Sequence, residues 1–585
     1  MHKYSRRTLL SASLMAAGSG ALAACTGAEP DADTAPRPGA PAHPDSPAHP
    51  DSPARPSTPA HPSTPAHPSS SARPTAAPAS GSTGLSDRRF VPDGPGGYVN
   101  PSDPEVLAVE REREGGAVRR FRLTATQTLL DLGGRTVRSW AYGDSVPGRE
   151  VRVTAGDILD LTLANHLPVG TTLHSHGVRL RCDMDGVPDL TQAAIRPGED
   201  FRYRFTVSHP GTYWLHSHLG MQLDRGLYAP LIVDDPRERL SYDKEWVVIL
   251  DDWVDGVDGS TPDAVLRSLG GGMPGMDMGG NEDSDKAGGH GGAGRHGHAS
   301  FDGTDGPSRI LRYSQSRLLG GPGGHVGYPY YLINGRLPHA PSVFRARPGD
   351  RIRLRIINAG AETAFRVALG GHPMTVTHTD GYPVEHQRTD ALLIGMAERY
   401  DVLVTAGDGV FPLVALAEGK EARALAVLRT SKGSGVPSAS VYPGELDGRL
   451  VPAGRLVPHE SVAFSNRKPD REIRIMLHGS MKKFDWNFDH RPYSLEQRHP
   501  IRENERVRLT LINATNMWHP LHLHGHTFAM TGIGAAGARK DTAAVLPHRK
   551  LVVDFYADNP GLWMLHCHNQ YHSESGMMTI LGYRK

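Results

Sequence analysis

The chain has 585 residues, too many for one hydrophobic core, and this length predicts two to four domains. Its formal net charge of +1 does not favour a nucleic acid or another polyanion as a partner. Histidine is the compositional outlier, with 31 residues against three cysteines, Cys25, Cys182 and Cys567. Cysteines so far apart do not indicate a disulfide framework.

Residues 1–25 have the pattern of an export signal. The twin arginines Arg6 and Arg7 precede a short apolar run that ends in "LAAC" at Cys25. This pattern resembles a twin-arginine signal with a bacterial lipoprotein cleavage box, which implies that Cys25 is lipidated and that the protein is anchored to the outer face of the cell membrane. No later segment approaches about 18 uninterrupted apolar residues, so the lipid is the only membrane anchor that we expect.

Residues 26–84 are predicted to be a disordered linker. A Pro/His-rich repeat with a period of six starts at Pro41, and such a segment has no apolar face to bury. One interpretation is a spacer between the anchor and the folded body. The other gives the linker histidines a role as weak copper ligands: His43, His49, His61 and His67.

From about residue 85 the chain has the pattern of an all-β protein. Short runs alternate apolar and polar residues with a period of two, as in "REVRVTAGDILDLTLAN", "VFRARPGDRIRLRIINA" and "IRENERVRLTLINATN". This period indicates strands with one buried face. Each of these three segments ends near an asparagine, at positions 165, 358 and 513, and a second repeated block follows at Gly211, Gly409 and Gly561.

The repeats predict three homologous domains at residues 85–240, 241–435 and 436–585. Domains of this size with short strands favour Greek-key β-sandwiches. The second domain carries an insertion at about residues 270–303 that is rich in glycine, methionine and histidine.

Four H-x-H pairs occupy equivalent places in the first and third domains. They are His174 and His176, His216 and His218, His522 and His524, and His566 and His568. Residues i and i+2 of a strand face the same side, so each pair presents two imidazoles together, and four pairs at one interface can hold a cluster of metal ions. At the same offsets the second domain has only core residues: Val367, Leu369, Val414 and Leu416.

Cys567 lies between His566 and His568 and therefore faces the opposite side of its strand. There it can join His519, His572 and Met577. Two imidazoles, one thiolate and a weak thioether ligand are the donors of a blue-copper electron-transfer site. The chain itself would join this site to the histidine cluster over about 10 Å.

These motifs resemble those of the three-domain bacterial multicopper oxidases, of the laccase-like and cuprous oxidase type, from about residue 85 to the end of the sequence. The resemblance implies three cupredoxin-like domains, four copper ions and reduction of O2 to water by four one-electron oxidations. It assigns type 1 copper to His519, Cys567, His572 and Met577, and type 2 copper to His174 and His522. The type 3 pair is assigned to His176, His216, His218, His524, His566 and His568.

Reduction of O2 needs protons, and two acidic residues are candidates for supplying them. Asp185 matches the family's aspartate beside type 2 copper, although an Asp-Gly pair is also a common turn. Many bacterial relatives have a glutamate directly after the last type 1 histidine, but this chain has Ser573 there, followed by Glu574. Cys182 is expected to be a free, buried thiol.

The reductant is left open between two substrate classes. Met273, Met276 and Met278, with nearby histidines, are soft donors that suit Cu(I), although a glycine-rich insertion can also be a plain linker. Met517 lies two residues before His519, as in copper-efflux oxidases, but Thr515 stands where those enzymes have an aspartate.

The first hypothesis is therefore a cuprous oxidase in copper tolerance, and the second an oxidase of phenols or aryl amines. The third is a copper-sequestering lipoprotein with little turnover. A monomer is expected.

Overall fold

The structure is a computed structural model, and it describes residues 96–113, 115–271, 306–432, 435–531 and 537–585. Several predictions concern residues outside these ranges: the export signal, Cys25, the Pro/His-rich linker, and Met273, Met276 and Met278 of the insertion. Within the described residues, three short α-helices accompany thirty strands, which confirms the all-β prediction. None of the helices in these ranges has the length and apolarity that a membrane span requires.

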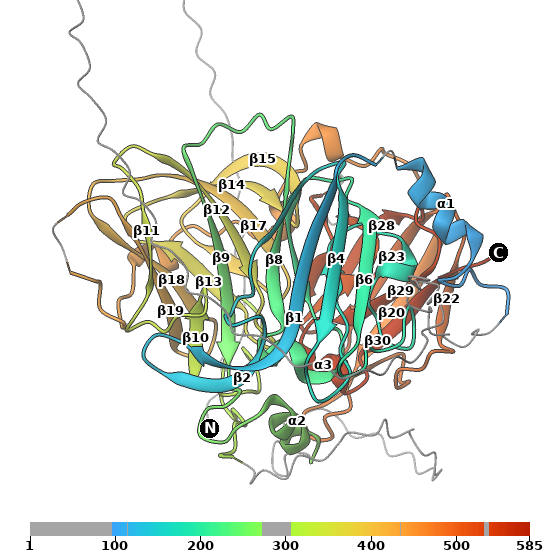
Figure 1. Cartoon of the computed structure of the whole chain (residues 1–585), viewed down its shortest axis with the longest axis horizontal. Coiled ribbons are helices and arrows are strands. Elements are labelled where there is room, and N and C mark those ends of the chain that lie inside the picture. Colours follow the sequence, from blue (N-terminus) through green and yellow to red (C-terminus); the bar gives the residue numbers. More distant parts are fainter. Residues whose placement is uncertain (1–95, 114, 272–305, 433–434, 532–536) are drawn as a thin grey trace, which may run out of the picture. The chain divides into compact units, whose positions relative to one another are not determined.

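The described strands form six sheets, which follow one another along the chain as three pairs (Figure 1). In the first pair, one sheet has the order β2 (Thr136–Tyr142), β1 (Val118–Asp131), β4 (Ile158–Asn165), β6 (Asp200–Thr206). The other has the order β3 (Val151–Thr154), β8 (Tyr228–Asp234), β7 (Gly211–His216), β5 (His174–His176). Helix α1 (Pro104–Glu112) precedes these strands, and the 3₁₀ helix η2 (Gly220–Arg225) connects β7 to β8.

The second pair has a six-stranded and a five-stranded sheet. The order of the first is β10 (Tyr330–Ile333), β9 (Lys244–Trp253), β12 (Arg351–Asn358), β17 (Arg399–Thr405), β14 (Met374–Thr379), β15 (Tyr382–Thr389). The order of the second is β11 (Ser342–Arg345), β19 (Ala422–Arg429), β18 (Val410–Ala417), β13 (Phe365–Leu369), β16 (Leu392–Ile394). Helix α2 (Pro262–Gly270) begins at the N-cap Thr261, whose side chain accepts a hydrogen bond from the backbone of Ala264.

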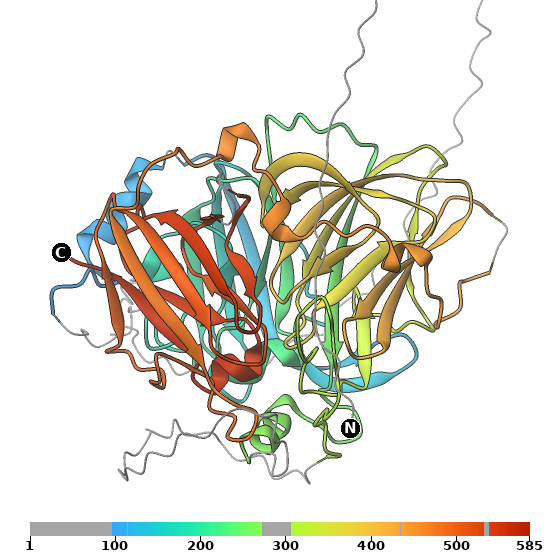
Figure 2. The same ribbon diagram turned by 180° about the vertical axis from the view of Figure 1, so that it is seen from behind.

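The third pair repeats the arrangement of the second. One sheet has the order β21 (Asn487–Phe488), β20 (Arg471–His478), β23 (Arg506–Asn513), β28 (Lys550–Tyr556), β25 (Phe528–Met530), β26 (Arg539–Lys540). The other has the order β22 (Arg498–Ile501), β30 (Met578–Tyr583), β29 (Leu562–Cys567), β24 (His519–Leu523), β27 (Thr542–Val545). Helix α3 (Gln570–Glu574) follows β29 and lies against η2 of the first pair, as Figures 1 and 2 show.

The repeated asparagines have the same structural role in all three pairs. Asn165, Asn358 and Asn513 each end a strand, and each side chain donates two hydrogen bonds to backbone carbonyls and accepts one from a backbone N–H two residues later. A buried amide that pairs both its donors and its acceptor fixes the loop that follows. In the first and third pairs, this loop leads to β5 and β24, which carry histidines.

The middle pair has the same strands without the histidines. β13 and β18 are antiparallel neighbours, as are β5 and β7. Val367, Leu369, Val414 and Leu416 are all buried there, which confirms them as core residues. The predicted domain boundaries stay predictions, and the strands of the three pairs fall at residues 118–234, 244–429 and 471–583.

Candidate metal centre

The eight histidines of the H-x-H pairs converge between the first and third sheet pairs. In the first pair, His174 of β5 is the direct neighbour of His216 of β7. In the third pair, His522 of β24 is the direct neighbour of His566 of β29. Because both places have the same antiparallel register, each presents a set of imidazoles on one face of its sheet.

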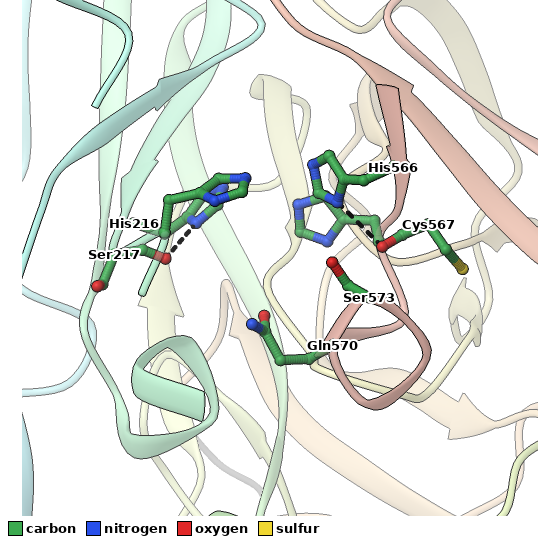
Figure 3. Close-up of a pocket in the computed structure, with 8 residues that line it drawn as sticks. His216, Ser217, His566, Cys567, Gln570 and Ser573 are labelled. Atoms are coloured by element: carbon green, nitrogen blue, oxygen red, sulfur yellow. Dashed lines mark hydrogen bonds between the residues drawn. The ribbon is translucent and has the colours of Figure 1, made fainter. Parts of the chain in front are cut away.

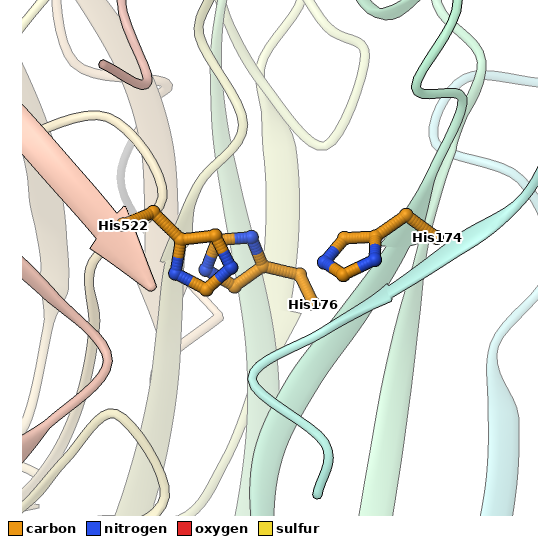
Figure 4. Close-up of side chains that lie close together, drawn as sticks. All are labelled: His174, His176 and His522. Atoms are coloured by element: carbon orange, nitrogen blue, oxygen red, sulfur yellow. The ribbon is translucent and has the colours of Figure 1, made fainter. Parts of the chain in front are cut away.

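The ring nitrogens fall into compact groups of three, within which the donor atoms lie no more than 4.8 Å apart. Two groups share no member and together use six histidines: His176, His216 and His568 in one, and His218, His524 and His566 in the other. The remaining two, His174 and His522, are grouped with His176 (Figure 4). The same two sets, six histidines and two, are those that the family resemblance implies for a type 3 pair and a type 2 site, and the structure divides the six into two triads.

Hydrogen bonds fix which nitrogen of each ring is available. The Nδ1 atoms of His174, His216, His522 and His566 lie 2.8–3.0 Å from backbone carbonyl oxygens, to which they donate. Their Nε2 atoms are left as the acceptor nitrogens, since the partner of one ring nitrogen sets the tautomer of the other. Those of His174, His216 and His522 have no hydrogen-bond partner, and that of His566 lies 3.1 Å from Nε2 of His524. His176 has the reverse arrangement: its Nε2 lies 3.1 Å from the Asp541 carboxylate.

The donor set fits copper. Nε2 of His174, His216, His218 and His522, and both ring nitrogens of His568, are buried without a hydrogen-bond partner. Buried polar atoms without partners are rare and costly, and a metal ion would satisfy these. Burial lowers the pKa of His176, His216, His218, His522, His524, His566 and His568, which keeps these imidazoles neutral and able to bind a metal.

Cys567 lies on the other side of β29, as predicted. Figure 3 shows its sulfur directed away from the His566 ring. Its Sγ lies 3.7 Å from Nδ1 of His519 and 3.8 Å from Nδ1 of His572, and these two nitrogens are 3.1 Å apart. Met577 is fully buried, and its backbone is hydrogen-bonded to both Cys567 and His572. Two imidazoles and a thiol thus converge within one buried site.

Local structure explains how these side chains meet. Asn569 accepts hydrogen bonds from the backbone of Tyr571 and His572, which begins α3 and turns His572 back toward Cys567. Thr515 Oγ1 lies 2.9 Å from Nε2 of His519, so Nδ1 of His519 is left to face the sulfur. Thr515, which departs from the aspartate of copper-efflux oxidases, therefore orients a candidate ligand.

Asp185 lies beside the cluster. Its Oδ2 accepts a hydrogen bond from Nδ1 of His524 at 2.8 Å, and its Oδ1 lies 3.2 Å from Nδ1 of His174. The carboxyl is buried and contacts His524 of one triad and His174 of the remaining pair, so it can both orient these rings and take part in proton transfer. The position beside the cluster is the predicted one, and the role in proton supply stays a prediction.

Glu574 is placed differently. Burial, with Asp263 nearby, raises its pKa to about 7. However, the side chains from α3 that line the pocket beside the cluster are Gln570 and Ser573 (Figure 3). A proton-donor role for Glu574 stays a prediction.

Sequence reasoning missed a buried carboxylate that holds two ligands. The Asp541 carboxylate contacts His176, and its backbone carbonyl accepts from His522. Arg399 of the middle pair forms two hydrogen bonds to Asp541, at 2.6 and 2.7 Å, and a third to the carbonyl of Thr212 in the first pair. Although burial opposes it, the Arg399 guanidinium holds the pKa of Asp541 well below its usual range. Arg399, on a sheet pair whose described residues include none of the cluster histidines, thus holds Asp541 against two of them.

The structure also describes two other residues that the sequence analysis singled out, Cys182 and Met517. Cys182 is free and buried, as expected, and its Sγ contacts the backbone of Leu562. Met517 is 2% exposed and belongs to the main core, so its thioether is not at the surface.

Replacing Asp185 with asparagine is expected to slow the reduction of O2 by about 10²- to 10⁴-fold, since an amide keeps the shape but cannot hold the proton. The measurement is O2 uptake with a donor that reduces the enzyme rapidly, while the blue absorption shows that the Cys567 site is intact. Asp200→Asn, in an exposed ion pair, is the matched control. Equal rates for the two variants would contradict the role.

Comparison with known proteins agrees with the fold and this site. Multicopper oxidase family models match residues 124–238, 314–433 and 466–584. The multicopper oxidase MmcO of Mycobacterium tuberculosis is 47% identical over 462 residues, which cover 79% of this chain and 86% of that protein. A copper resistance protein A homolog of Pseudomonas syringae pv. tomato is 28% identical, over 82% and 93% of the two chains. The crystal structure of the laccase from Botrytis aclada has the same fold, with a TM-score of 0.63 at 24% identity, over 80% and 88% of the chains.

The fold and the site define a copper-dependent oxidase built from three cupredoxin-like domains. The chain belongs to the multicopper oxidase family, whose members use four copper ions and O2 as the electron acceptor.

Proposed function

We propose that the protein is an extracytoplasmic cuprous oxidase that serves copper tolerance. The observation that carries this proposal is the pair of connected donor sets: a Cys-His₂ site on one side of β29 and eight histidines on the other. Storage of copper would need no such connection. The relatives named for copper resistance support the choice of reductant.

The proposed ligands follow the predicted assignment. His519, Cys567 and His572 would hold type 1 copper, with Met577 as a weak fourth ligand, and His174 and His522 would hold type 2 copper. The type 3 pair would be held by the two triads, His176, His216 and His568, and His218, His524 and His566. When bound, the copper ions would supply the redox chemistry: single electrons would enter at the Cys567 site, and O2 would be reduced to two waters at the histidine cluster.

The side chains of this chain prepare both sites. Burial raises the pKa of the Cys567 thiol, so metal binding must release its proton. Backbone carbonyls, Asp185 and Asp541 fix the tautomers of the cluster imidazoles before any ion arrives. Asp185 delivers protons, and Gln570 and Ser573 provide polar groups at the pocket through which water can leave.

Export and anchoring are part of the proposal. The twin-arginine pattern and Cys25 support a lipoprotein on the outer face of the membrane, where copper ions first meet the cell. We further propose that the enzyme acts as a monomer, because each ligand of both sites comes from one chain.

Deleting residues 271–300, which include Met273, Met276 and Met278, is expected to lower the oxidation of Cu(I) selectively. Thioethers bind Cu(I) and have no affinity for a phenol. The measurement is O2 uptake by the copper-loaded enzyme with Cu(I) and with 2,6-dimethoxyphenol. A full-length variant with leucine at the three methionine positions separates the effect of the sulfur atoms from that of the length.

The outcomes separate the three hypotheses. Loss with Cu(I) alone supports the cuprous oxidase. Unchanged rates with both donors make the insertion a linker, and the choice between Cu(I) and phenols or aryl amines then depends on which donor has the higher kcat/KM. No uptake with any donor leaves only sequestration.

A further inference from the structure

A second group of donor side chains lies on the third sheet pair, outside the sites described above. β20 and β21 are antiparallel, and His478, the last residue of β20, is the direct cross-strand neighbour of Asn487, the first residue of β21. The side chains of such neighbours lie on the same face, about 5 Å apart at their Cβ atoms. His490 follows in the turn after β21 and brings a second imidazole to this place.

The two imidazoles are stacked. The ring centroids of His478 and His490 are 3.4 Å apart, with an angle of 28° between the rings. Two pairs within the eight-histidine cluster have the same arrangement: His174 with His524 at 4.0 Å and 27°, and His176 with His522 at 3.8 Å and 21°. Stacked imidazoles thus also occur among the candidate metal ligands of this chain.

Two donor atoms of this group lack partners. Nε2 of His478 and Oδ1 of Asn487 are both buried and form no hydrogen bond. Leaving a buried polar atom unpaired costs about 1–3 kcal/mol, so two such atoms on neighbouring residues point to a ligand that pairs with both. Imidazole nitrogen and amide oxygen are both donors to a copper ion.

Charge and backbone geometry favour a cation at the same place. The carboxylate of Asp489 accepts a hydrogen bond from the backbone N–H of Met476 at 2.8 Å, so one negative charge is held at this end of β20. Asp489 and His490 have φ values of 52° and 58°, in a turn where asparagine and glycine are the usual residues. Met476 lies two residues before His478 on the same face of β20, is 40% exposed, and adds a soft thioether.

Only the hairpin between β20 and β21 separates this group from the Cys567 site. Trp486, which precedes Asn487, packs against His572 with ring centroids 4.4 Å apart and against His519 at 5.2 Å. Gly479, which follows His478, lies so close to Trp486 that a Cβ there would be 2.6 Å from its ring. His478 is next in sequence to Gly479, and Asn487 is next to Trp486. The donor residues therefore adjoin the Trp486 ring, which packs against the candidate type 1 ligands His519 and His572.

We propose that Met476, His478, Asn487 and His490 form a docking site for an exchangeable copper ion, which gives its electron to the Cys567 site across Trp486. This inference rests on the proposed cuprous oxidase function and names where its substrate binds. Each Cu⁺ bound here loses one electron and leaves as Cu²⁺. Four such electrons and four protons convert one O2 into two waters.

His490→Gly is the test variant, because glycine adopts the positive φ of this exposed turn at least as well as histidine and folding should not suffer. The copper-loaded, full-length enzyme is titrated with Ag⁺, a monovalent ion that is not oxidised, by calorimetry. We expect one Ag⁺ fewer per chain than in the wild type. The ratio of kcat/KM for Cu(I) to that for 2,6-dimethoxyphenol should fall about tenfold or more. His386→Ala, at an exposed position on β15, is the matched control and should change neither value.

The results separate the possibilities. An unchanged Ag⁺ stoichiometry in both His490→Gly and a second variant, His478→Gln, would overturn the site. Loss of one Ag⁺ with an unchanged kcat/KM ratio would overturn its role in docking the substrate. A wild-type enzyme that does not oxidise Cu(I) would refute the proposed function, while the Ag⁺ stoichiometry would still decide whether the site exists.

Discussion

Replacing Cys567 with serine is expected to abolish the blue absorption and to reduce oxidase activity with every donor to the uncatalysed background. Among the described residues, the Cys567 sulfur is the only thiol near His519 and His572, and a hydroxyl is a poor ligand for copper. The eight-histidine cluster lies on the other face of β29 and should keep its metal. The measurements are the visible absorption spectrum, O2 uptake and the copper content per chain.

Cys182→Ser is the matched control, because Cys182 is the other described cysteine and is also fully buried. A serine there can keep both contacts to the Leu562 backbone. We expect this variant to retain its colour and its activity. A Cys567→Ser enzyme that stays blue, or a Cys182→Ser enzyme that turns colourless, would refute the assignment of the thiolate.

Replacing Arg399 with alanine should lower the free energy of unfolding by about 3–5 kcal/mol, because it leaves the buried Asp541 carboxylate without its counter-charge. The same change frees the Asp541 carboxylate to rotate away from Nε2 of His176, at 3.1 Å, and from Nδ1 of His522, at 3.5 Å, so that it no longer fixes those rings. We therefore also expect loss of type 2 copper. Arg399→Lys should recover only part of both effects, since lysine cannot form the two parallel hydrogen bonds.

Chemical denaturation measures the stability, and the type 2 signal in electron paramagnetic resonance measures the metal. Arg122→Ala is the control: this arginine pairs with Asp200 on the surface, where both side chains are more than half exposed, and its loss should cost at most about 1 kcal/mol. If the Arg399 and Arg122 variants unfold alike and both keep the signal, the middle domain does not position the cluster.

Most of the candidate site could be predicted because its geometry is local. Two histidines at i and i+2 of a strand must face one side, and the cysteine between them must face the other. This rule placed His566, Cys567 and His568 before any fold was known. The three asparagines that end β4, β12 and β23 revealed the repeats, because the loop after each strand needs the same three hydrogen bonds.

The residues that sequence reasoning missed act over long separations. Arg399 and Asp541 are 142 positions apart, and Asp541 meets His176 across 365 positions. No local period marks such a contact, and neither residue belongs to a metal-binding motif. The His478–Asn487 pairing escaped notice for a similar reason: it depends on the register of β20 and β21, and each side chain alone is an ordinary surface residue.

The eight histidines of the cluster come from the first and third sheet pairs, across a junction that no disulfide closes in the described chain. Ions shared by the two sides act there as cross-links that the chain can gain or lose. Since a ligand bound only by the folded form stabilises it by mass action, the durability of this enzyme is tied to the copper of its surroundings. We therefore expect proteolysis of the enzyme to be faster in copper-poor medium. Where copper is plentiful, the bound ions would slow its degradation.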